Sequence, residues 1–172
     1  MKNISTKKLI TAAITGALYT ALTMILSPLS YGPIQLRVSE ALCVLPFFLP
    51  YTAWGLFFGC AAANIISSAG ILDVVFGSLA TLISCLCIAA IGRKSSSLKG
   101  RIFACLMPAV FNGLIVGAVL SYAMAGLSPV KDPGAYLICA LQIAAGELAV
   151  LFAVGLPLMS FLLRQNFFAR FD

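Results

Sequence analysis

The sequence predicts an all-α polytopic membrane protein, with about six transmembrane helices in a single domain over residues 1–172. Of its residues, 62% are hydrophobic and only 9% are charged, whereas a soluble domain usually carries about 25% charged residues. A soluble core could not hide this much apolar surface. The apolar runs are continuous, unlike the alternating segments of about ten residues that form a membrane β-barrel. We therefore expect helices that cross a bilayer.

The charge and motif content of the chain excludes several functions. The formal net charge is +6, but the lysines and arginines lie between or beyond the apolar runs, which is typical of cytoplasmic loops rather than of nucleic-acid binding. The chain contains six cysteines inside apolar runs and no histidine, so we expect no metal site, no cofactor and no Ser/His or Cys/His nucleophile. It has no GxxxxGK[ST] phosphate loop, so it cannot hydrolyse ATP by itself. We expect a protein that is not an enzyme.

The expected helices follow from the apolar runs and the positive-inside rule. The N-terminal residues and the segment 93–101 are both basic, which places both in the cytoplasm and requires an even number of crossings between them. Since Pro46 and Pro50 interrupt the long apolar stretch after residue 39, we expect two short helices there. The C-terminal tail is also expected in the cytoplasm. The six expected helices cover residues 9–29, 39–49, 52–68, 71–91, 102–125 and 134–163.

One polar stretch, YGPIQLRVSEAL at 31–42, stands out between the apolar runs. After the Gly-Pro break it carries Gln35, Arg37 and Glu40, which we expect at the outer surface, where the stretch would line or cover a ligand site. An alternative is that Arg37 and Glu40, three residues apart, form only a local ion pair worth less than about 1 kcal/mol.

Further polar residues lie within the expected spans, where they are costly and therefore candidates for function. At 1.5 Å per residue, Glu147 and Asn112 come out at similar depth in the last two helices. Gln142 is shallower, and Asn64 lies near an outer helix end. This gradation indicates a pocket open to the outside; alternatively, Asn112 and Gln142 only bond helix to helix. Asp73, at an outer helix end, would also be favoured there by the helix dipole alone.

Small residues line one face of the first expected helix. Ala13, Ala17 and Ala21 are spaced by four, and such spacing lets another helix approach closely. The face could pack within this chain or dock a partner subunit.

Together these features resemble the substrate-binding S components of energy-coupling-factor (ECF) vitamin transporters, and more closely the QueT family. The matching segments are YGPIQLRVSEAL, the region of Asn64, and LDVVFGSLATL at 72–82, with the alanine face on the first helix. The resemblance implies a six-helix subunit of the bacterial plasma membrane that works with a coupling membrane subunit and two ATPase subunits. It implies uptake of a queuosine precursor, a 7-deazaguanine or queuine-like base.

The implied ligand suggests roles for the polar residues. A guanine-like edge offers a ring N–H and an exocyclic amine, and a single carboxylate, Glu147, can accept from both. Its carbonyl and ring nitrogens suit the amides of Asn112, Gln142 or Asn64. A cationic aminomethyl group would favour a second carboxylate, Glu40 or Asp73, and an aromatic ring such as Tyr31 could stack on the base. Gln35 and Arg37 complete the candidate ligand-binding set.

Two other functions fit the same sequence. The chain could be a stand-alone secondary transporter or channel that uses Glu147 as a proton or ion site, or a membrane scaffold without a ligand. Uptake that requires ATPase subunits would exclude the first, and ligand binding by the isolated chain would exclude the second.

Overall fold

The chain is described here from a computed structural model, over residues 5–32, 34–126 and 129–164. The described residues form helices and connecting turns, without a β-strand, which confirms the expected all-α class. The elements are α1 (Thr6–Ile25), α2 (Ser27–Ser30), the 3₁₀ helix η1 (Val38–Phe47), α3 (Thr52–Asn64), the π-helical turn η2 (Asp73–Gly77), α4 (Ser78–Lys94), α5 (Leu98–Ala125), α6 (Pro133–Val150), the π-helical turn η3 (Leu151–Gly155) and α7 (Leu156–Arg164).

Within the described part of the chain, four helical runs are long and apolar enough to cross a membrane: Thr6–Ile25, Asp73–Lys94, Leu98–Ala123 and Pro133–Arg164. The last combines α6, η3 and α7 in one continuous helical run. α3 and η1 are shorter than the roughly 20 residues that span a bilayer. The structure therefore supports four of the six expected spans by length.

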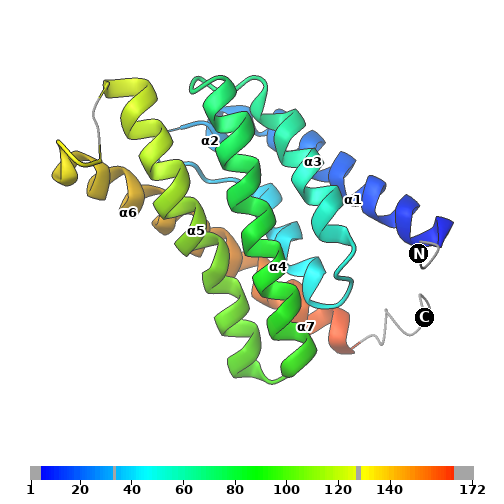
Figure 1. Cartoon of the computed structure of the whole chain (residues 1–172). Helices are drawn as coiled ribbons and strands as arrows, with labels where there is room; N and C mark the ends of the chain where they lie inside the picture. The colour runs from blue at the N-terminus through cyan, green and yellow to red at the C-terminus, as the bar shows by residue number, and fades with distance from the viewer. Residues whose placement is uncertain (1–4, 33, 127–128, 165–172) are drawn as a thin grey trace.

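The expected helix at 39–49 is wrong in type, because η1 is a 3₁₀ helix of 10 residues. Runs of 3₁₀ helix longer than a few residues are uncommon. Pro46 lies inside η1, where it cannot donate a backbone hydrogen bond. η1 packs against α4, α1, α3 and η3, so that surrounding helices enclose it at the centre of the molecule (Figure 1).

Helix boundaries also differ from the expected ones. α3 ends at Asn64 rather than at residue 68, and α5 begins at Leu98 rather than at 102. The side chain of Ser97 caps α5 by accepting a hydrogen bond from the Gly100 amide, a common start signal in helices.

α1 and α3 pack closely because glycines remove side chains from their interface. A Cβ atom on Gly16 would lie 2.3 Å from the Gly55 carbonyl oxygen, and one on Gly59 would lie 2.4 Å from the Gly16 carbonyl oxygen. Both distances are too short for real side chains, so the backbones touch directly, as small residues permit between membrane helices.

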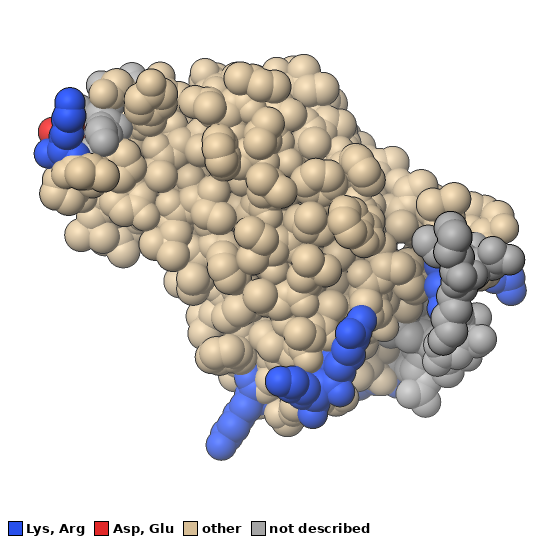
Figure 2. All heavy atoms as spheres, in the orientation of Figure 1, with Lys and Arg blue, Asp and Glu red and all other residues tan. Residues whose placement is uncertain are grey.

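The charged side chains gather at the ends of the molecule, and the surface between them is almost free of charge (Figure 2). Lys7 and Lys8 begin α1, and Arg93, Lys94 and Lys99 surround the turn between α4 and α5; all five are exposed. In Figure 2 the lysines and arginines lie mainly along the lower and right-hand end. The expected cytoplasmic segments 1–4 and 165–172 lie outside the described residues.

Candidate functional site

A buried ion pair links the polar stretch to η2. The Arg37 Nη2 atom lies 3.3 Å from Asp73 Oδ2, and the two side chains are 3% and 0% exposed. Arg37 also lies over the ring of Tyr31, with its Cζ atom 5.5 Å from the ring centroid. The alternative of a local ion pair between Arg37 and Glu40 is wrong, because Arg37 pairs with Asp73, 36 residues along the chain. Both side chains are buried within the fold, and their expected position at the outer side of the membrane stays a prediction.

The pKa of Arg37 is raised above its ordinary value. Burial on its own would lower this pKa, but Tyr19, Asp73, Cys60 and Glu40 nearby stabilise the positive charge and outweigh it. The guanidinium of Arg37 is therefore a fixed positive charge beside Asp73.

Asn64, at the end of α3, lies beside the Arg37–Asp73 ion pair and bonds to the backbone of Asp73. Its Nδ2 atom donates to the Asp73 carbonyl oxygen over 3.0 Å, and Tyr31 donates its hydroxyl to the carbonyl of neighbouring Ala63. Within the described chain, Asn64 Oδ1 and Asp73 Oδ1 are buried without a hydrogen-bond partner. Asp73 opens the π-helical turn η2, and such turns occur frequently at functional sites.

A second buried pair joins α5 to α6. Asn112 Nδ2 donates to Glu147 Oε1 over 2.7 Å, and the residues are 3% and 2% exposed. This contact confirms their expected similar depth. The other two acceptors of the pair, Asn112 Oδ1 and Glu147 Oε2, are buried without a partner among the described residues. The pair does bond helix to helix, yet it leaves two acceptor oxygens available.

Gly146 brings the polar stretch against α6. A Cβ atom on Gly146 would lie 2.2 Å from the Ile34 carbonyl oxygen and 3.1 Å from that of Gln35. Gln35 is buried and has a φ of 49°, in the left-handed region that non-glycine residues rarely adopt. Such backbone strain is found most often at functional sites. The contact sets this segment beside the residue that precedes Glu147.

We expect Gly146→Ala to weaken both the fold and ligand binding, because the new methyl group must push segment 34–35 away from α6. Gly134→Ala on the same helix is the matched control, since nothing lies within 4 Å of its Cβ position. Alanine favours a helix by about 1 kcal/mol over glycine, so Gly134→Ala should be neutral or stabilising. Thermal unfolding in detergent would check both, and equal melting temperatures would contradict this packing.

Glu40 is fully buried in η1 and is held by two donors. Tyr19 of α1 donates its hydroxyl to Oε1 over 2.5 Å, and the Cys43 thiol donates to Oε2 over 3.0 Å. Arg37 and Glu40 both lie close enough to Glu147 to act on its charge. The sequence reasoning missed Tyr19; its only signal was a hydroxyl-bearing ring on the buried face of a helix that also carries five threonines.

Gln142 does not join the cluster, because its side chain is exposed on α6. The other candidate residues are buried or half-buried and form what we call the buried cluster. They are Tyr31, Gln35, Arg37, Glu40, Asn64, Asp73, Asn112 and Glu147. Among the residues that the structure describes, no group of three or more His, Cys, Asp or Glu side chains could hold a metal ion.

The alanine face expected on α1 is exposed. Ala13 and Ala17 line an exterior groove of about 380 Å³ between α1 and α3, which Trp54 and Phe58 border. Ala21 is exposed as well but lies outside this groove. The closest backbone approach between α1 and α3 is instead at Gly16, Gly55 and Gly59.

Two comparisons with known proteins are informative. A protein-family profile described as QueT transporter matches residues 9–164. The chain is also 44% identical over 85 residues to the queuosine precursor transporter QueT of Lactococcus lactis subsp. cremoris (strain MG1363). That alignment covers 48% of this chain and 50% of the relative, so the chain spans about half the length of the relative that it matches. No solved structure matches the chain.

Proposed function

Since the chain belongs to the QueT transporter family, we propose that it is the substrate-binding subunit of an ECF-type, ATP-driven importer. It captures a queuosine precursor, a 7-deazaguanine or queuine-like base, from outside the bacterial plasma membrane. Family membership and four apolar spans make it a multi-pass membrane protein. The basic residues at one end of the molecule fit a cytoplasmic inner face.

One observation carries the proposal: four buried side-chain oxygens in the cluster lack a hydrogen-bond partner among the residues that the structure describes. They belong to Asn64, Asp73, Asn112 and Glu147. Buried polar atoms are rarely left unpaired, because each costs about 1–3 kcal/mol. All four are acceptors, so the ligand that satisfies them must be rich in N–H donors, as a guanine-like edge with its ring N–H and exocyclic amine is.

The charge balance of the cluster favours a ligand with a positive group. Among the described residues, the buried charged side chains are three carboxylates, Glu40, Asp73 and Glu147, and one guanidinium, Arg37. An aminomethyl group on the base would offset the excess of negative charge and donate up to three hydrogen bonds. The ring of Tyr31, beside Arg37, is the candidate for stacking on the base.

The groove between α1 and α3 is the proposed docking surface for the coupling membrane subunit, with Ala13 and Ala17 in the groove and the exposed Ala21 beyond it as the contact face. It is apolar, and small residues form its floor, so an apolar helix can approach closely. The long exposed side chains of Trp54 and Phe58 at its border would cover such a helix.

A larger side chain in the floor of the groove should separate assembly with the coupling subunit from ligand binding. We expect Ala17→Leu to abolish assembly with the coupling subunit and to leave ligand affinity unchanged, because Ala17 is exposed in the groove, on a different face of α1 from the buried Tyr19. Leu18→Phe, on an exposed face of the same helix outside the groove, should retain assembly. Co-purification from membranes and calorimetry would measure the two properties. Lost ligand binding with intact assembly would contradict the assignment of α1.

The function itself is tested by uptake into proteoliposomes. Reconstitution of the chain with the coupling subunit and both ATPases should give accumulation of radiolabelled aminomethyl-7-deazaguanine that requires ATP. Accumulation by the chain alone, driven by a proton gradient, would instead identify a secondary transporter. Binding of no base in any assembly would leave only a scaffold.

A further inference from the structure

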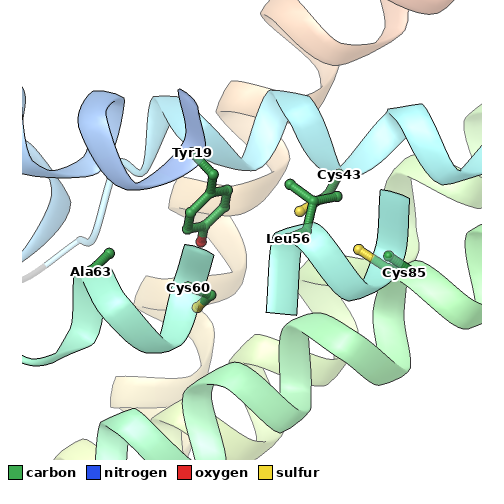
Figure 3. Packing of buried hydrophobic residues seen from close by; sticks show 7 residues of the cluster. Tyr19, Cys43, Leu56, Cys60, Ala63 and Cys85 are labelled. Carbon is green, nitrogen blue, oxygen red and sulfur yellow. The ribbon is translucent and has the colours of Figure 1, made fainter. Parts of the chain in front are cut away.

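Tyr19 places a polar group deep among apolar and sulfur-containing side chains. Its side chain is fully buried, and it belongs to a buried cluster that also contains Cys43, Leu56, Cys60 and Cys85. Figure 3 shows the ring extending from α1 into this cluster, with its hydroxyl at the far end. That hydroxyl donates to Glu40 Oε1. A phenylalanine would fill the same space, so packing alone does not explain the hydroxyl.

We propose that Tyr19 is a positioning residue for the ligand site, which orients the carboxylate of Glu40 and so sets how Glu40 receives the ligand. The inference rests on the proposed function, because it concerns the affinity for the same ligand. It extends the site to α1, which contributes no other residue to the buried cluster described above.

The two oxygens of Glu40 differ from those of the other two carboxylates. Asp73 and Glu147 each keep one buried oxygen without a partner in the described chain. Glu40 instead receives one donor at each oxygen, from Tyr19 on α1 and from Cys43 on η1. A carboxylate oxygen has two acceptor positions, so Glu40 can still accept from a ligand, but only in the directions that these donors leave open.

The ionisable neighbours of Glu40 explain why its orientation matters. It lies near Arg37, three residues before it in the polar stretch, and near Glu147 of α6. A turn of its carboxylate would move negative charge toward or away from Glu147, which is the proposed reader of the base. The hydroxyl of Tyr19 prevents that turn.

The chain supplies a matched control one helical turn further along α1. Thr23 is also fully buried, and its hydroxyl shares a hydrogen bond of 2.6 Å with Ser39 of η1. Tyr19→Phe and Thr23→Val therefore each remove one hydroxyl that joins α1 to η1. Only Tyr19→Phe removes a donor to Glu40.

Calorimetric titration with aminomethyl-7-deazaguanine tests the proposal on five proteins: the wild type, Tyr19→Phe, Glu40→Gln, the double variant and Thr23→Val. Because the carboxylate of Glu40 would lose the donor that fixes its orientation, Tyr19→Phe should weaken binding about 10-fold or more. In the Glu40→Gln background the same change should have less than about a 3-fold effect, because the effects of residues in direct contact are not additive. Thr23→Val should stay within about 3-fold of the wild type. Additive effects, or equal losses in Tyr19→Phe and Thr23→Val, would overturn the proposal.

A second readout needs no ligand. The carboxylate stretching bands of Glu40, assigned by the infrared difference between wild type and Glu40→Gln, should shift in Tyr19→Phe and stay unchanged in Thr23→Val. If the wild type binds no base, the proposed function fails, and the infrared result still decides whether Tyr19 orients Glu40. A Glu40 band that is unchanged in Tyr19→Phe would reject the role of Tyr19 whatever the ligand.

Discussion

Replacing Glu147 by glutamine should weaken binding of a 7-deazaguanine precursor by at least about 30-fold. Glu147 Oε1 is already engaged by Asn112, and Oε2 is the buried acceptor that remains for the ligand. The glutamine amide keeps one oxygen, which Asn112 would occupy, and turns an N–H donor toward the donors of the base. Loss of one partner of a buried charged contact costs about 2–5 kcal/mol, and each 1.4 kcal/mol is about tenfold in affinity.

Isothermal titration of the purified chain would measure this change. Gln142→Ala is the matched control on the same helix: its side chain is exposed, so affinity should change less than about 2-fold. If Glu147→Gln retained full affinity, Glu147 would not read the base, and the carboxylates of Glu40 and Asp73 would become the candidates.

Breaking the Arg37–Asp73 pair should destabilise the protein more than any other single change of charge in the described chain. Asp73→Leu leaves the buried guanidinium without its carboxylate, and removal of one partner of a buried pair costs about 3–5 kcal/mol. A chain of this size loses about 2–4 °C in melting temperature per kcal/mol, so a fall of about 10 °C is expected. The polar stretch at 31–42 would at the same time lose its ion pair with η2, so ligand binding should fall as well.

A double variant separates the cost of leaving one buried charge unpaired from the loss of the ion pair itself. Arg37→Met combined with Asp73→Leu replaces both charges by apolar groups, and such replacements are often neutral. The double variant should therefore melt at a higher temperature than Asp73→Leu, although it should not bind the ligand. Arg93→Gln, at an exposed charge on α4, should stay within about 0.5 kcal/mol of the wild type. A double variant less stable than Asp73→Leu would contradict an electrostatic origin of the loss.

Local rules predicted part of this structure. Composition was sufficient for the all-helical class, and the rise of 1.5 Å per residue was sufficient to place Asn112 and Glu147 at one depth, because both lie within regular helices. The same helical geometry explains why Gln142 is exposed on α6. It lies five residues before Glu147, about 140° around the helix, and so points away from the cluster.

Contacts between distant segments could not be predicted in this way. Arg37 and Asp73 are 36 residues apart, and Tyr19 and Glu40 are 21 apart, so each pair depends on how the intervening helices pack. The close approach at Gly146 depends on the left-handed backbone of Gln35, which a glutamine does not signal.

The most direct test of the central claim is calorimetry on the wild-type chain with three bases: aminomethyl-7-deazaguanine, guanine, and a 7-deazapurine that lacks the exocyclic amine. The four unpaired acceptors and the excess of carboxylates predict tight binding of the first, clearly weaker binding of the second, and the weakest binding of the third. Equal affinities for all three bases, or binding of none, would contradict a site that reads the donors of a queuosine precursor.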